Sequence, residues 1–235
     1  MNLIPIKTRI LKEGENIFTF FLEYLKNAKS ENIQDNTVLV ISSKIVAVSQ
    51  NKIVNIQNLE DFRKAVFAEA DEILVDKNKF LLTVKNGVVI ANAGIDQSNS
   101  KKGKIILWPE NIQEFADKFT KKIKKVFNLK NFGVVVSDSR VTMRRRGTVG
   151  VAIAWSGFFG IKDERGTEDL FGNKLEVSTV NIADNLVSSA EILMGQAAES
   201  TPFVLIENLD KNLFTEIQQN HKSAEISKEE DLFLI

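Results

Sequence analysis

Apolar side chains recur three or four positions apart in four segments of this 235-residue chain: residues 15–28, 59–70, 109–127 and 182–194. This spacing places them on one face of a helix, and in the first segment that face runs from Ile17 to Ala28. Pro109 suits the first turn of a helix, and Gly195 suits the position just after one. The pattern therefore predicts four amphipathic helices.

Short apolar runs predict the strands: residues 38–41, 80–84, 88–91, 134–136, 150–154 and 203–206. An Asn-Gly dipeptide at residues 86–87 favours the tight turn of a β-hairpin. After the first run, Ser-Ser-Lys at residues 42–44 predicts a polar turn, and an apolar stretch then leads to a second turn at residues 51–52. We expect an α+β fold with mixed, largely antiparallel sheets and packed helices.

Composition narrows the class of protein. The 31 Lys and Arg residues balance 31 Asp and Glu residues, which argues against a general nucleic-acid binder or a membrane-surface protein. No apolar run approaches the roughly 20 residues of a membrane span, and the N-terminus lacks the pattern of a signal peptide. We expect a cytoplasmic protein of one large or two small domains at 26.4 kDa.

The chain has no cysteine and a single histidine, His221. Disulfides, thiolate nucleophiles and zinc sites of the usual kind are excluded. His221 stands in a polar stretch and is expected to be solvated surface, which excludes a Ser–His triad. Any chemistry must come from carboxylates, hydroxyls, amides, Lys and Arg, and these groups suit a hard metal ion.

Two acidic residues follow apolar strands. Asp96 comes after the run at residues 88–91, and Asp138 after the run at residues 134–136, each with small polar neighbours. Two such carboxylates, converging with hydroxyl and amide oxygens, would suit Mg²⁺ or Mn²⁺. The alternative is that both are turn formers or helix caps.

Arginine is concentrated beside Asp138. Only seven of the 31 basic residues are arginines, and four of these lie within residues 140–146. The planar guanidinium matches phosphate or carboxylate, so an anionic substrate could bind there. A solvated charged surface is the alternative.

The sequence contains neither of two common nucleotide-binding motifs, the Walker loop and the Rossmann glycine pattern. The segment at residues 165–174 fails the Walker pattern, and no G-x-G-x-x-G follows a strand. Any nucleotide must therefore be bound in another way. Met194, Gly195 and Gln196 close the last predicted helix, where Gly195 by itself predicts a helix C-cap.

Together these segments resemble the coenzyme F420-0:γ-glutamyl ligase family over most of residues 1–206. The resemblance rests on residues 42–46, 91–96, 98–99, 137–139, 145, 147, 150–153, 165–166, 169–172 and 194–196. It implies an amide-forming enzyme that uses GTP, a divalent metal ion and L-glutamate, with an α+β fold in an intertwined homodimer. Residues 1–206 would form the catalytic region, in one or two intertwined subdomains, while the role of residues 207–235 stays open.

The resemblance also assigns site residues. The catalytic residues would be Asp96, Asp138 and Arg145. The ligands of Mg²⁺ or Mn²⁺ would be Asp96, Asp138, Ser139 and Gln196, with K⁺ as a further candidate ion. The nucleotide site would comprise Pro5, Ile6, Ser43, Lys44, Asn99, Met194, Gly195 and Gln196. As a separate hypothesis, Arg144, Arg145 and Arg146 would bind the anionic acceptor or the carboxylates of glutamate.

The chain departs from the family in one region. Relatives have Ser-Asp-Thr-Phe-Gly-Arg-Pro-Trp-Arg where residues 137–145 read Ser-Asp-Ser-Arg-Val-Thr-Met-Arg-Arg, and Val48 and Thr148 replace a usual Lys and Gln. The rewritten stretch is the one expected to contact the acceptor. This leaves three functions: a ligase acting on F420-0 through an acyl phosphate, a tetrahydrofolate γ-glutamyl ligase, or an inactive nucleotide-binding homologue.

Overall fold

The computed structural model describes residues 1–26 and 32–233, and its centre is a five-stranded sheet. The strand order is β1 (Asn2–Ile6), β12 (Phe203–Glu207), β2 (Thr37–Ser42), β8 (Phe132–Val141) and β9 (Thr148–Ser156). Within this sheet β2 and β8 run parallel, and the other neighbours are antiparallel. The predicted α+β class with mixed, largely antiparallel pairing is confirmed.

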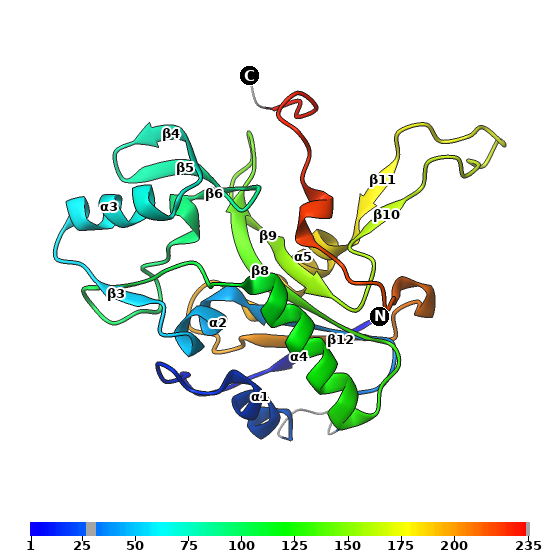
Figure 1. Cartoon of the computed structure of the whole chain (residues 1–235), viewed down its shortest axis with the longest axis horizontal. Coiled ribbons are helices and arrows are strands. Elements are labelled where there is room, and N and C mark those ends of the chain that lie inside the picture. Colours follow the sequence, from blue (N-terminus) through cyan, green and yellow to red (C-terminus); the bar gives the residue numbers. More distant parts are fainter. Residues whose placement is uncertain (27–31, 234–235) are drawn as a thin grey trace.

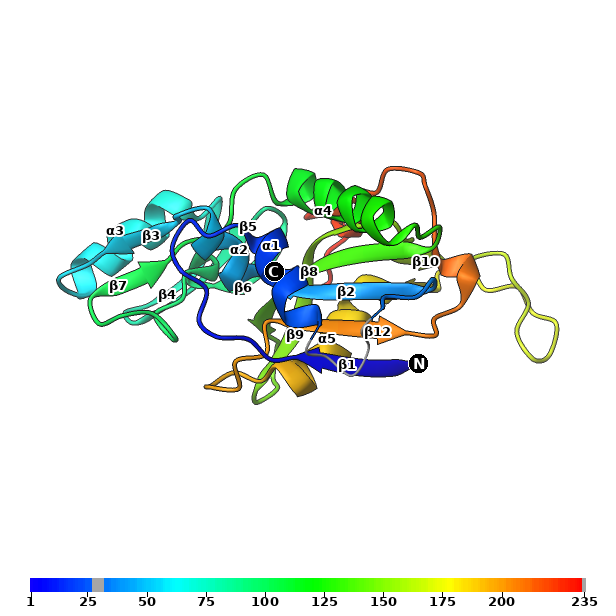
Figure 2. The same cartoon turned by 90° about the horizontal axis from the view of Figure 1, so that it is seen from below.

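Helices cover both faces of this sheet (Figures 1 and 2). One face packs against α1 (Ile17–Leu25) and α4 (Ile112–Phe127), whose Phe18 and Phe119 rings meet edge to face at 5.3 Å. The other face packs against α5 (Ile182–Met194). Because β2 and β8 are buried from both sides, their sequences are continuous apolar runs rather than alternating ones.

The helix predictions need two corrections. α4 begins at Ile112 and not at Pro109, because Asn111 before it has a left-handed backbone with φ of 47°. The polar turn and apolar stretch expected after residue 41 form a helix instead, α2 (Ser43–Ser49), which buries Val46 and Ala47. The apolar stretch at residues 45–48 is only four residues long, which is too short for its periodicity to distinguish a helix from an extended segment. Ala28 lies outside the described residues.

A smaller unit packs beside the main sheet and is drawn in cyan and pale green in Figure 1. It comprises α3 (Leu59–Glu69), β3 (Ile53–Asn55) paired with β7 (Lys104–Ile106), and β4 (Glu72–Lys77), β5 (Phe80–Lys85) and β6 (Val88–Ala91) as one sheet. Its core contains Phe62, Val66, Leu81, Ala93, Ile95 and Ile105. The predicted Asn-Gly hairpin is confirmed, since Asn86 and Gly87 both have positive φ.

A two-stranded ribbon projects from the body (Figure 1). It consists of β10 (Ile161–Asp163) and β11 (Thr179–Asn181) with the long loop between them. Leu170, Phe171 and Val177 on that loop are almost fully exposed. The apolar runs of the sequence did not indicate these two short strands, nor β1, β3, β4 and β7.

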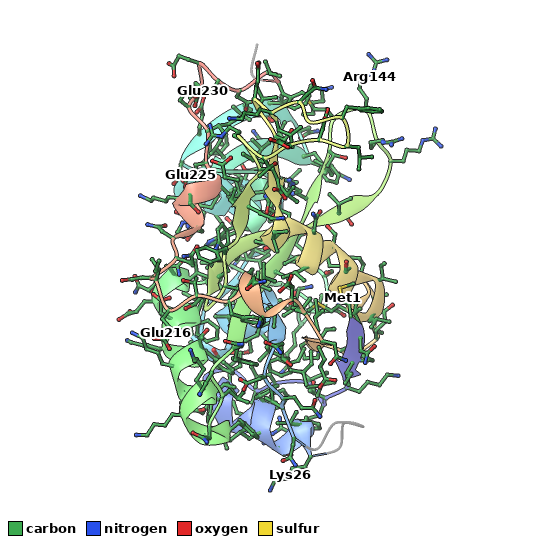
Figure 3. All side chains as sticks on the ribbon, turned by 90° about the vertical axis from the view of Figure 1, so that its right-hand side faces the viewer. Met1, Lys26, Arg144, Glu216, Glu225 and Glu230 are labelled. Carbon is green, nitrogen blue, oxygen red and sulfur yellow. The ribbon has the colours of Figure 1, made fainter. Side chains whose placement is uncertain are left out.

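The C-terminal segment, residues 208–233, crosses from the main sheet to the smaller unit (Figures 1 and 3). It contains two short 3-10 turns, η2 (Lys211–Leu213) and η3 (His221–Ala224). Lys228 forms an ion pair with Glu72 at 2.6 Å. His221 is half-buried against Gln113 of α4 rather than solvated, and this burial lowers its pKa. None of the described helices is long and apolar enough to cross a membrane.

Candidate functional site

A pocket of about 230 Å³ opens where the main sheet meets the smaller unit. It brings together nine of the residues that the sequence predicted for metal and nucleotide binding: Ser43, Lys44, Asp96, Asn99, Asp138, Ser139, Met194, Gly195 and Gln196. These residues come from four distant parts of the chain. The fold therefore assembles one site from separate motifs.

Asp138 lies at the inner wall of this pocket, beside the start of α2. The parallel pairing of β2 with β8 sets Ser42 opposite Ser137, so the next residue on each chain segment meets its counterpart. Ser43 Oγ donates to Asp138 Oδ2 at 3.0 Å, and the Ser139 backbone N–H donates to Oδ1 at 2.7 Å. The carboxylate is thus held by two donors.

The charge of Asp138 is costly in this place. Burial raises the pKa of Asp138 to about 6, and the negative charge of Asp96 adds to the increase. The hydrogen bonds from Ser139 and Ser43 and the charge of Lys44 oppose it without cancelling it. A half-buried carboxylate beside another carboxylate favours a bound cation.

Asp96 reaches the pocket from the smaller unit. Lys44 Nζ lies 2.6 Å from Asp96 Oδ2 and 3.1 Å from Ser98 Oγ. The Ser98 backbone N–H donates to the other carboxylate oxygen at 2.5 Å. Lys44 of α2 therefore places a positive charge between the main sheet and the smaller unit.

The turn before Asp96 has an unusual backbone. Asn92, Ala93 and Gly94 all adopt left-handed conformations, with φ of 53°, 54° and 69°. Such a conformation is costly for alanine and needs support from its surroundings. The buried Thr83 hydroxyl supplies it by accepting from the Ala93 N–H at 2.8 Å. Gly94 lies against Trp108, whose ring a Cβ would overlap.

Glu191 is a site residue that the sequence reasoning missed. It lines the pocket from α5, and burial together with the nearby charge of Asp138 raises its pKa to about 7. Its signal in the sequence was a lone acidic residue one helical turn before Met194 and Gly195. Asp96, Asp138 and Glu191 thus bring carboxylates to the pocket from three parts of the chain, and Glu199 also belongs to its lining.

A hydrogen bond joins two of the loops that line the pocket. Asn99 Nδ2 donates to the Ala197 carbonyl at 2.8 Å and so joins the loop after Asp96 to the segment after α5. Gly195 caps α5 with φ of 70°, and its N–H donates to the Glu191 carbonyl. The C-cap interpretation of Gly195 and its place in the pocket are therefore both correct.

Some predicted site residues lie away from the pocket. Pro5 and Ile6 belong to β1, and the pocket lining begins two residues later, at Thr8. Arg144, Arg145 and Arg146 are exposed at the tip of the β8–β9 hairpin, and Figure 3 shows Arg144 projecting from the body. The structure does not bring these five residues to the carboxylates, and their roles stay predictions.

The oxygen donors of the pocket fit a hard divalent cation. Carboxylates of Asp96 and Asp138, the Ser139 hydroxyl and the Gln196 amide are oxygen ligands of the kind that Mg²⁺ takes. Within residues 1–26 and 32–233, no three acidic or histidine side chains are close enough to hold an ion by themselves. Mg²⁺ is commonly held by one or two carboxylates plus substrate phosphates and water, which is the arrangement that this pocket allows.

Comparison with known proteins identifies relatives of this chain. Residues 5–208 match the model of the F420-0:Gamma-glutamyl ligase family. The coenzyme F420:L-glutamate ligase of Methanocaldococcus jannaschii is 33% identical, over 99% of this chain and 96% of that protein. Those of Methanopyrus kandleri and Archaeoglobus fulgidus are 32% and 30% identical, over 79% and 86% of this chain and 80% and 84% of theirs. The resemblance drawn from the sequence motifs is confirmed.

Proposed function

Because this chain belongs to the F420-0:Gamma-glutamyl ligase family of amide-forming ligases, we propose that it adds L-glutamate to coenzyme F420-0 in a reaction that consumes GTP and needs a divalent metal ion. The observation that carries this proposal is the pocket. It combines Asp96, Asp138 and Glu191 with the ammonium group of Lys44, and so offers places for both a cation and a phosphate. We further propose that the protein works as a homodimer.

The reaction has two steps. A carboxylate oxygen of the acceptor attacks the γ-phosphorus of GTP, the bond to GDP breaks, and an acyl phosphate forms. The amine of glutamate then attacks the acyl carbon, phosphate leaves with the bonding electrons, and the amine proton passes to solvent. A divalent cation held by Asp96 and Asp138 would neutralise the charge of the transferring phosphoryl group.

The residues of this chain contribute positioning and charge. Lys44 is a point charge on a flexible stem and would bind a phosphate oxygen while staying beside Asp96. The Ser43 hydroxyl keeps Asp138 oriented into the pocket. Asn99 joins two loops of the pocket lining, and the nucleotide would bind beside them. Positioning of this kind provides most of the catalysis in phosphoryl transfer.

A second acceptor is favoured by one observation. The stretch at residues 139–144 departs from the family pattern, while most of the predicted metal and nucleotide residues are retained and lie in the pocket. Tetrahydrofolate is also an anionic acceptor that ends in glutamate, so the same chemistry would serve a tetrahydrofolate γ-glutamyl ligase. The alternative of an inactive homologue has the replacement of the family lysine by Val48 in its favour.

One assay separates these functions. The protein is incubated with GTP, Mn²⁺, labelled glutamate and either F420-0 or tetrahydrofolate monoglutamate, and phosphate release and labelled product are measured. We expect phosphate release coupled to F420-0. Phosphate release with tetrahydrofolate monoglutamate but not with F420-0 would identify the protein as a tetrahydrofolate γ-glutamyl ligase instead. Absence of release with either acceptor would favour the inactive homologue, and ATP in place of GTP tests the nucleotide.

A further inference from the structure

The β8–β9 ladder is interrupted directly before Asp138. Val136 pairs with Ala154, but the next residue, Ser137, pairs with Ala152, so that Ile153 is an extra residue on β9. Bulges of this kind bend a strand and redirect the side chains beside them. The direction of Asp138 into the pocket therefore depends on how this bulge is held.

A single carboxylate on α5 holds both strands at the bulge. Asp184 Oδ1 accepts a hydrogen bond from the Ala152 backbone N–H at 2.8 Å. This bond gives a partner to a backbone donor at the point where the strand ladder is interrupted. Asp184 Oδ2 accepts from Arg140 Nη2 at 3.0 Å. Arg140 is two residues after Asp138 on the same strand, so Asp184 is tied to β9 by one oxygen and to β8 by the other.

The surroundings keep this contact in place. The side chain of Asp184 is only 17% exposed. Its own backbone N–H is capped by the Asn181 side chain at 2.9 Å. Gly150 packs so closely against α5 that a Cβ there would overlap Val187, and Ser188 Oγ donates to the Gly150 carbonyl at 3.2 Å. The first turns of α5 are thus fixed on β9.

The far end of the same helix carries Glu191, Met194 and, just beyond it, Gln196 to the pocket. We propose that Arg140 and Asp184 are positioning residues of the metal site, which fix α5 on the bulge and so set Asp138 against Glu191 and Gln196. The proposal rests on the proposed function, in which Asp138 binds a divalent cation. Arg140 replaces a phenylalanine of the family pattern, so this half of the contact belongs to the part of the chain that differs from its relatives.

The test compares Mn²⁺ affinity, measured by isothermal titration calorimetry on the full chain both without nucleotide and with a saturating non-hydrolysable GTP analogue, with thermal unfolding of the same samples. The variants are Asp184→Asn, Arg140→Met and Arg140→Lys. The matched control is Asp76→Asn, which breaks the Arg63–Asp76 ion pair of the smaller unit. Asparagine at position 184 can still accept from the Ala152 N–H, while it loses the charge that pairs with Arg140.

We expect Asp184→Asn and Arg140→Met to weaken Mn²⁺ binding by about 10- to 100-fold, the range for groups that orient metal ligands. The double variant should lose no more than either single one, since both break the same contact. The Mn²⁺ affinity of Arg140→Lys should lie between those of Arg140→Met and the wild type. The affinity of Asp76→Asn should equal that of the wild type. A purely structural role would lower the unfolding temperature and leave Mn²⁺ affinity unchanged.

Mn²⁺ affinity within twofold of wild type in Arg140→Met would overturn the proposal. This variant decides the question even where Asp184→Asn fails to fold, because it keeps the hydrogen bond to Ala152. The affinities do not depend on the acceptor. A wild type that binds Mn²⁺ but releases no phosphate with either acceptor would refute the proposed function and leave this inference standing. A wild type that binds no Mn²⁺ either alone or with the GTP analogue would overturn the inference directly.

Discussion

Asp138 is one of two pocket residues whose ionisation the fold clearly opposes. Burial raises its pKa to about 6, and burial with the charge of Asp138 raises the pKa of Glu191 to about 7. Both groups have pKa values near ~4 in an unfolded chain. The folded protein therefore binds more protons than the unfolded one between about pH 4 and 7, and its stability falls as pH rises through that window.

The first prediction concerns this pH dependence in metal-free protein. Asp138→Asn should remove a large part of the fall in the free energy of unfolding between about pH 4 and 6, with the remainder due to Glu191, and should raise stability at pH 7 by on the order of 2 kcal/mol. Urea unfolding at several pH values measures it. The control is Asp163→Asn. Arg165 lowers the pKa of Asp163 to about 2, so the contribution of this exposed pair to stability rises with pH instead of falling. An unchanged pH profile in Asp138→Asn would contradict the prediction.

The second prediction concerns Lys44, which lines the pocket beside Asp96. Lys44→Met should weaken binding of a non-hydrolysable GTP analogue, measured with saturating Mg²⁺, by about 10- to 100-fold, the range expected when a charged donor to phosphate is lost. Lys52→Met is the matched control, since Lys52 pairs with Glu110 at 2.6 Å outside the pocket lining. Equal nucleotide affinity in the two variants would argue against phosphate binding by Lys44.

At the scale of elements, the turn that carries Asp96 is fixed by its packing as well as by its backbone. Gly94 and Gly147 both have positive φ, at 69° and 91°. A Cβ on Gly94 would overlap Trp108, whereas nothing lies within 4 Å of the same position on Gly147. The two glycines therefore separate the steric cost of a side chain from the backbone cost.

The third prediction uses this pair. Gly147→Ala should cost about 1 kcal/mol of unfolding free energy, the usual cost of a non-glycine residue in the left-handed region. Gly94→Ala should cost at least about 2 kcal/mol more, because Trp108 must move. Urea unfolding measures both. The same loss in both variants would mean that the Trp108 contact adjusts freely.

Element boundaries show where sequence reasoning succeeds. The buried strands β2, β8 and β12 and the helix α5 were evident, since long apolar runs and helical stripes follow directly from burial. The helix α2 was not, because it is short and its apolar residues are consecutive. The short strands β3 and β7 pair with each other across about 50 residues of sequence, so their formation depends on contacts between distant segments.

The candidate site divides in the same way. Asp96 and Asp138 were found because each follows an apolar strand, and both lie in the pocket. Glu191 and Asp184 were missed because each is a single polar residue on an amphipathic helix. In the sequence, such a residue cannot be distinguished from one on the solvent-exposed face. The β-bulge that gives Asp184 its role leaves no mark in the sequence of β9.

At the scale of the whole molecule, the C-terminal segment connects the two units. Its Glu225 side chain lies over Gly87 of the hairpin turn, and its Lys228 pairs with Glu72 of β4. Individual surface pairs contribute about 0–1 kcal/mol, so the effect of this segment on global stability should be small. Its effect on the local opening of the smaller unit should be larger.

The fourth prediction tests this with a chain ending at residue 219. Hydrogen exchange should become about tenfold faster at the amides of β5 and β6, while β2 and β8 exchange as before, since local opening and global unfolding are separate events. Lys64→Ala, which removes the Lys64–Glu60 surface pair of α3, serves as the control. Faster exchange throughout the chain would show that the segment stabilises the main sheet instead.

The pocket is joined by hydrogen bonds between residues far apart in the sequence. Ser43 and Asp138 are separated by 95 positions, and Asn99 and Ala197 by 98. During synthesis on the ribosome, a nascent chain that ends before these later residues therefore cannot form the pocket. This holds even after β2 and the smaller unit have emerged. Closing such long loops is slow, so folding intermediates should acquire their secondary structure before they bind any ion. A ligand of this pocket would then bind only chains that have been made past residue 202.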